Sequence, residues 1–191
     1  AAADIHSCAR PDEVRVRHVA LDLTLDFARQ TASGTCTLQV ERLDRRAPLW
    51  VDTQGLHIVS VHTADAAAQK LDWQFGTNDP LLGTPLRIAL PDGVDRVAID
   101  YATMPATQGA MQWLSPEQTS GQKPFLFTQG QAILTRSWIP LQDSPGVRVT
   151  WNATIRAPHD LRPLMSATLS GGNSQDGYTF AMPHPVPSYL I

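Results

Sequence analysis

Alternation of apolar and polar residues is the feature that most limits what this chain can fold into. From Val19 to Phe27 every second residue is apolar, while Asp22, Thr24 and Asp26 lie between them. Successive side chains of a β-strand point to opposite faces, so this pattern predicts a strand with one buried and one solvated face.

Similar short segments recur along the chain, separated by turn sequences such as Ala-Ser-Gly at 32–34 and Pro-Asp-Gly at 91–93. We expect further strands at 35–41, 49–52, 56–61, 71–75, 86–90, 97–101, 125–128, 147–156 and 178–182, and one helical turn at 132–137. Strands this short and frequent predict an all-β fold of curved mixed or antiparallel sheets, arranged as a sandwich or a saddle. No repeat or linker-like stretch appears, so one domain over residues 1–191 is the simplest organisation.

The composition is that of a folded protein without concentrated positive charge. Hydrophobic residues make up 42% and charged residues 17%, and the formal net charge is -3. Nucleic acids and anionic membrane surfaces attract clustered lysine and arginine, so neither is expected as a partner. No apolar run approaches the roughly 18 residues that a membrane-spanning helix needs, so we expect no membrane association.

A polar block at residues 128–145 interrupts the strand pattern and indicates a site. Gln129 and Gln131 are two residues apart, so an extended backbone would present both amides on one face, where they can hold a polar ligand group. Arg136 and Asp143 belong to an Arg-x-x-x-Pro-x-x-Asp-x-Pro sequence. Their spacing predicts a pair across a turn that the prolines stiffen, with the arginine favouring the ionised carboxylate. We expect this structural corner to hold the glutamines in place.

This block, together with Trp-Leu-Ser-Pro-Glu-Gln-Thr-Ser-Gly at 113–121, resembles the N-terminal domain of zinc aminopeptidases of the aminopeptidase N and leukotriene A4 hydrolase family. The wider family carries Gln-x-Glu where this chain has Gln129-Gly130-Gln131, and the Gln-x-Gln form is similar to the leukotriene hydrolase branch. The resemblance extends from about Val14 to the Ile191 end. Gly130 departs from the bulkier residues common at its position, which bears on the shape of the local pocket.

The resemblance implies a parent enzyme that uses zinc to hydrolyse N-terminal residues from peptides. That family binds zinc through His-Glu-x-x-His and a later Glu, and has a Gly-x-Met-Glu-Asn loop, none of which occurs in this sequence. The catalytic residues and the zinc are therefore expected in a catalytic domain outside this chain, on which this domain packs. On its own the chain is expected to be inactive and to expose the apolar surface of a severed interface. Ile191 also reads as the middle of an apolar strand, which suggests an excised fragment.

The resemblance also implies a substrate-binding role for three residues. Gln131 would accept a hydrogen bond from the α-ammonium group of the peptide, Gln129 would support it, and Ala132 would line the pocket for the first side chain. Judged by residue type alone, Gln131 can equally be a buried amide that satisfies backbone groups at the corner. The alternative function is a non-enzymatic β-sandwich module that binds protein or carbohydrate.

Other residues give little sign of chemistry. The six histidines include no i, i+4 pair for a metal, and no Gly-x-Ser-x-Gly elbow is present. Trp73 and Trp151 fall in step with apolar strand faces, which favours core packing over sugar binding.

Cysteine usage and the start of the chain leave the compartment open. Cys8 and Cys36 are the only cysteines and allow at most one disulfide, although Cys36 sits in an apolar strand pattern that favours a buried free thiol. The Ala-Ala-Ala start fits either a secretory cleavage site or a cloning remnant. The resemblance implies a cytoplasmic location, and a preceding signal peptide would imply a periplasmic or secreted one.

Overall fold

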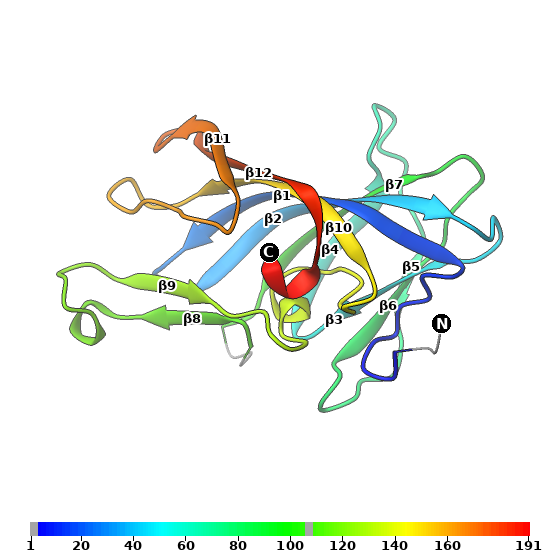
Figure 1. Ribbon diagram of the computed structural model, residues 1–191, viewed down its shortest axis with the longest axis horizontal. Helices are drawn as coiled ribbons and strands as arrows, with labels where there is room; N and C mark the ends of the chain where they lie inside the picture. Colours follow the sequence, from blue (N-terminus) through cyan, green and yellow to red (C-terminus); the bar gives the residue numbers. More distant parts are fainter. Residues whose placement is uncertain (1–3, 106–108) are drawn as a thin grey trace.

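The computed structural model describes residues 4–105 and 109–191, and about half of this part of the chain is β-strand (Figure 1). The strands are β1 (Val14–Asp26), β2 (Thr31–Arg42), β3 (Leu49–Thr53), β4 (Leu56–Thr63), β5 (Trp73–Phe75), β6 (Thr84–Ile88), β7 (Arg96–Thr103), β8 (Met111–Leu114), β9 (Phe125–Thr128), β10 (Arg148–Arg156), β11 (Thr168–Asn173) and β12 (Gly177–Pro187). The described residues also form three short 3-10 helices, η1 (Pro116–Gln118), η2 (Thr135–Ser137) and η3 (Ser188–Leu190). The all-β prediction is confirmed.

Seven strands form one mixed sheet in the order β11-β12-β10-β1-β2-β7-β4. β1 is its centre, since it pairs antiparallel with β2 and parallel with β10. Figure 1 shows this sheet arching over a three-stranded sheet, β3-β6-β5, and over the short helices near the C-terminus. The β8-β9 hairpin projects to the side of the arch (Figure 1). The short helices, and with them the polar block, therefore lie under the concave side of the large sheet.

The apolar face of β1 forms the centre of the core, as the alternation predicts. Val19, Leu21 and Leu23 are at most 2% exposed, and they belong to the same apolar cluster as Val51 of β3 and Ile88 of β6. Contact between the large sheet and the small sheet thus fills the space under the arch. Trp151 of β10 is also buried in this cluster, which confirms its assignment to the core.

Two strands, β8 and β11, do not follow from the sequence pattern, and the prediction that the chain ends inside a strand is wrong. β11 is exposed along its whole length and contains two glycines, so it has no apolar alternation and depends on its pairing with β12. β8 is short and only half-buried. The chain does not end in a strand: β12 stops at Pro187, and the hydrogen bond from Ile191 N to Ser188 O closes the turn of η3.

Both cysteines are free thiols whose pKa the fold raises. Cys36 is fully buried in β2, and Cys8 is half-buried near Asp52. Burial raises the pKa of both thiols well above the ordinary value, and the negative charge of Asp52 adds to the effect at Cys8. Only the thiolate attacks disulfide reagents.

We therefore expect neither thiol of the folded protein to react with an aromatic disulfide reagent at about pH 8, near the ordinary thiol pKa. Both should react once urea unfolds the chain. Absorbance of the released thiolate measures the reaction, and rapid labelling of one equivalent before unfolding would show that Cys8 is accessible and contradict this expectation.

No helix in the described part of the chain is both long and apolar enough to cross a membrane. The Ala-Ala-Ala start, on which the choice of compartment depended, lies outside the described residues.

Candidate functional site

The polar block begins with a tight turn between β9 and η2. Gln129 N donates to Ala110 O at 2.9 Å, and Ala110 N donates to the Ser137 hydroxyl at 2.7 Å, so both ends of the turn are tied to the start of β8. Leu134 N donates to Gly130 O at 2.9 Å, which closes the turn. Gln131 therefore lies in a turn, and strand alternation does not set the direction of its side chain as the sequence spacing suggested.

Solvent exposure of Gln131 distinguishes its two interpretations, a substrate-binding amide and a buried amide that satisfies backbone groups. Gln129, Gln131 and Ala132 are exposed, whereas Gly130 between them is buried. Within residues 4–105 and 109–191, neither glutamine amide has a hydrogen-bond partner. The interpretation of Gln131 as a buried amide that satisfies the corner is thus wrong, because burial is the condition on which it rests. Both side-chain amides can therefore form hydrogen bonds with a group outside the described residues.

Behind the turn, Arg136 and Asp143 form a buried ion pair. Arg136 is 0% exposed and Asp143 is 1% exposed. Arg136 Nε donates to Asp143 Oδ2 at 3.0 Å, and the backbone N of Arg136 donates to the same oxygen at 3.2 Å. The rest of the guanidinium group donates to the carbonyls of Leu82 at 2.7 Å and His6 at 2.8 Å. One side chain therefore ties together the polar block, the loop before β6 and the N-terminal segment.

A second carboxylate completes this buried cluster. Asp52 of β3 is 3% exposed, and its Oδ1 lies 3.6 Å from Arg136 Nη1. Its Oδ2 accepts hydrogen bonds from Asp143 N at 2.9 Å and from the Ser7 hydroxyl at 2.5 Å. No motif in the sequence assigns a role to Asp52 or Ser7. Asp52 lies 91 residues from Asp143 along the chain, so no local spacing signals the contact.

The carboxyl group of Asp143 also reaches the C-terminal helix. Its Oδ1 accepts a hydrogen bond from the Ser188 hydroxyl at 2.5 Å. Burial raises the pKa of Asp143 above its ordinary value, against the opposing effects of Ser188 and Arg136, which both donate to it. The net direction is opposite to the one expected from Arg136 alone, because the loss of hydration outweighs the charge. Three donors converge on this carboxyl group, which is the arrangement that a carboxylate requires.

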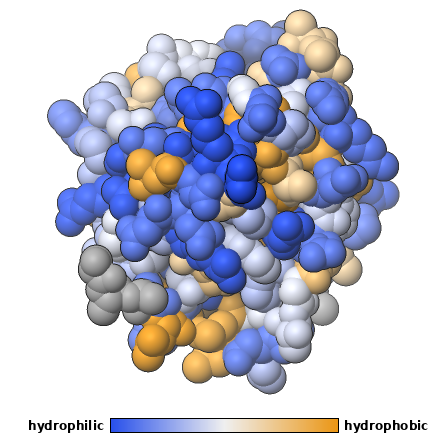
Figure 2. Space-filling view, turned by 90° about the vertical axis from the view of Figure 1, so that its right-hand side faces the viewer, coloured by the Kyte–Doolittle hydropathy of each residue, from blue (hydrophilic) through white to orange (hydrophobic). Residues whose placement is uncertain are grey.

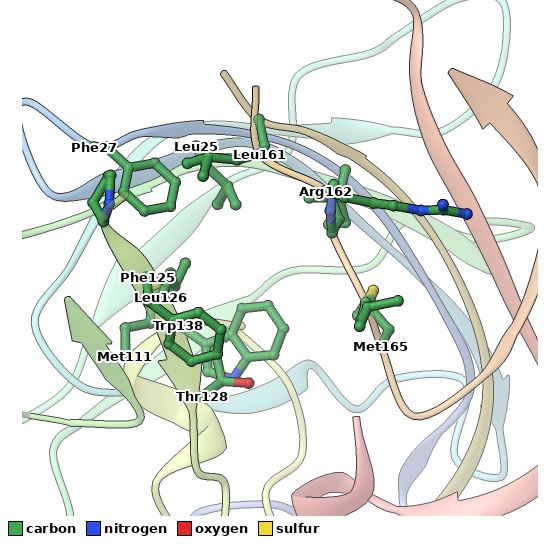
Figure 3. Close-up of a pocket in the computed structure, with 15 residues that line it drawn as sticks. Leu25, Phe27, Met111, Phe125, Leu126, Thr128, Trp138, Leu161, Arg162 and Met165 are labelled. Carbon is green, nitrogen blue, oxygen red and sulfur yellow. The ribbon is translucent and has the colours of Figure 1, made fainter. Parts of the chain in front are cut away.

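An apolar pocket of about 220 Å³ opens beside the turn (Figure 3). Leu25 and Phe27 line it from the end of β1, and Leu126 from β9, while Met165 faces them across the opening (Figure 3). Thr128, directly before Gln129, belongs to the same lining. The pocket therefore extends to the residue that precedes the glutamine turn.

Large apolar side chains are exposed around this pocket. Phe125 is 54% exposed and Leu164 is 82% exposed, and both contribute to its lining. By contrast, the face seen in Figure 2 is mostly hydrophilic, with hydrophobic residues in small separate groups. Clustered apolar exposure of this kind marks an interaction surface more often than isolated exposed residues do.

No metal centre can be built from the described residues. Within 4–105 and 109–191, no group of three His, Cys, Asp or Glu side chains is placed to hold an ion. The described site is a set of hydrogen-bonding and apolar groups.

Comparison with known proteins identifies the family. Residues 15–190 match the Peptidase M1 N-terminal domain. The chain is 38% identical to the leukotriene A-4 hydrolase of Xenopus laevis, over 99% of this chain and 32% of that protein. It is 33% identical to leucine aminopeptidase 2 of Sclerotinia sclerotiorum, over 93% of this chain and 31% of that protein. The chain thus spans about a third of the length of these relatives.

Solved structures agree with the sequence relatives. The native leukotriene A4 hydrolase of yeast superposes with a TM-score of 0.90 at 31% identity, over 99% of this chain and 30% of that one. An M1 zinc metallopeptidase of Deinococcus radiodurans superposes with a TM-score of 0.74 at 19% identity, over 95% of this chain and 41% of that one, and this match shows the fold alone. The chain therefore belongs to the Peptidase M1 N-terminal domain family.

Proposed function

We propose that this chain is the N-terminal domain of a zinc aminopeptidase that hydrolyses N-terminal residues from peptides, and that it supplies one wall of the substrate pocket. The family match and the leukotriene hydrolase and aminopeptidase relatives support the parent activity. The observation that carries the pocket-wall role is the Gln131 amide, which is exposed on a turn that a buried ion pair holds from behind.

Gln131 would hold the free end of the peptide. Its side-chain carbonyl can accept a hydrogen bond from the α-ammonium group, and such a bond to a charged group is worth roughly 1.5–3 kcal/mol. Gln129 would act as a second contact, and Ala132 would border the first side chain. The effect is to fix the distance from the peptide terminus to the bond that is cleaved.

Zinc would be held by residues outside this chain, where it would polarise the scissile carbonyl and activate a water molecule. This chain would contribute no metal ligand and no catalytic residue. Its part is to orient the peptide and to exclude water from one side of the pocket.

The apolar surface around Phe125 and Leu164 would pack on the catalytic domain. Its position next to the glutamine turn supports this, because the wall must face the same neighbour that holds the substrate. We propose no nucleic-acid or membrane partner, since the net charge is -3. We also propose a cytoplasmic location, which suits two free thiols.

Turnover of aminoacyl reporter substrates tests the proposal. The full-length protein and the 191-residue chain are compared with and without added zinc, on alanyl and arginyl substrates. We expect turnover only from the zinc-loaded full-length protein. Turnover by the isolated chain would place the chemistry in this domain, and an inactive, zinc-loaded full-length protein would favour the binding-module alternative.

A further inference from the structure

The C-terminal helix η3 lies directly against the turn that presents Gln131. A β-carbon on Gly130 would lie 2.9 Å from Tyr189 Cα and 3.2 Å from the Tyr189 carbonyl oxygen. It would also lie 2.6 Å from the Thr135 hydroxyl oxygen. These separations are too short for a side chain, so the backbone of the turn and the backbone of η3 touch with nothing between them. A shift of η3 toward the turn would therefore displace Gly130, and Gln131 with it.

A buried bridge fixes this contact from behind. Ser188 is 2% exposed, and its hydroxyl donates to Asp143 Oδ1 at 2.5 Å. The other oxygen of Asp143 accepts from Arg136 N and Nε at 3.2 Å and 3.0 Å. Arg136 belongs to η2, the short helix into which the Gln131 turn runs. The Asp143 carboxylate thus accepts a hydrogen bond from η3 with one oxygen, and hydrogen bonds from Arg136 at the base of the turn with the other.

The opposite end of η3 is held separately. The Ser166 hydroxyl donates to Leu190 O at 2.6 Å. This bond is exposed, so water can replace it when it is lost, whereas the buried Ser188 hydroxyl has no such substitute. Ser188 is therefore the buried anchor of η3.

We propose that Ser188 is a positioning residue for substrate binding. Through Asp143 and Arg136 it fixes η3 on the Gly130 turn, and so it sets where the Gln131 amide is placed. The inference rests on the amine-binding role proposed for Gln131. It adds a residue that never touches the substrate and that nonetheless controls how well the amine is held.

The test is Ser188→Ala in the zinc-loaded full-length protein, with KM and kcat measured on an alanyl reporter substrate. We expect KM to rise on the order of tenfold with little change in kcat, because a misplaced binding group costs affinity before it affects the zinc chemistry. Ser144→Ala is the matched control. It removes another hydroxyl-to-carboxylate bond, from Ser144 to Asp4 Oδ2 at 2.6 Å, which does not reach η3. We expect its KM to be unchanged.

A double substitution separates positioning from general destabilisation. In a Gln131→Ala background, Ser188→Ala should raise KM no further, because the group that it positions is already gone. If the KM increase of Ser188→Ala is the same in both backgrounds, or if Ser188→Ala leaves KM unchanged while Gln131→Ala raises it, the positioning role is overturned and the amine-binding role stands. If Gln131→Ala itself leaves KM unchanged, the amine-binding role fails, and the inference fails with it.

Discussion

Replacing Arg136 by alanine is expected to lower the free energy of unfolding by about 3–5 kcal/mol, the usual cost of removing one partner from a buried ion pair. The guanidinium group is 0% exposed and faces two carboxylates, Asp143 at 3.0 Å and Asp52 at 3.6 Å. Without it both charges remain buried with no cation. The carbonyls of Leu82 and His6 also lose their donors. Lysine should recover only part of the loss, because a single ammonium cannot reach all these acceptors.

Urea unfolding followed by tryptophan fluorescence measures this loss. Arg17→Ala is the control, since Arg17 pairs with Glu41 at the surface, where both side chains are 43–50% exposed. Exposed pairs contribute about 0–1 kcal/mol, so this variant should unfold almost as the parent does. An Arg136→Ala variant no less stable than Arg17→Ala would mean that the buried cluster does not hold the fold together.

Replacing Gln131 by alanine in the full-length protein is expected to lower kcat/KM about ten- to hundredfold, as follows from losing one hydrogen bond to a charged group. The side chain is exposed and has no partner among the described residues, so its removal should leave stability unchanged. Gln131→Glu should retain activity or increase it, because a carboxylate adds charge attraction to the ammonium group.

Steady-state kinetics on the alanyl reporter substrate, with thermal unfolding alongside, checks this prediction. Gln122→Ala is the matched control, because Gln122 is an exposed glutamine in the loop between β8 and β9. If Gln131→Ala and Gln122→Ala behave alike, the turn does not bind the substrate amine.

The parts of the fold that follow from local pattern could be predicted from the sequence. β1 is predicted because burial of one face imposes alternation on its residues, and its buried residues Val19, Leu21 and Leu23 follow that alternation. β11 could not be predicted, since it lies at a sheet edge with neither face buried and nothing selects its side chains. The prediction of a strand at the end of the chain fails because it rests on the apolar residues Leu190 and Ile191. The backbone there forms the turn of η3, and the Ser188 hydroxyl bonds to Asp143.

The candidate site also has parts that the local sequence predicts and parts that only the fold reveals. The spacing of Arg136 and Asp143 predicts their pair, because two opposite charges seven residues apart can meet across one turn. Asp52 and Ser188 complete the cluster from 91 and 45 residues away, so only the folded chain brings them to Asp143. The raised pKa of Asp143 also depends on burial, which the local sequence does not reveal. Exposure of Gln131 likewise becomes known only from the folded turn.

A crystal structure of the full-length protein with an inhibitor that carries a free α-amine tests the central claim most directly. The pocket-wall role predicts Gln131 Oε1 within about 3 Å of the amine nitrogen, at hydrogen-bond distance. It also predicts Ala132 beside the first side chain and η3 still seated on Gly130. An amine held only by residues outside this domain, with Gln131 directed away from it, would contradict the claim.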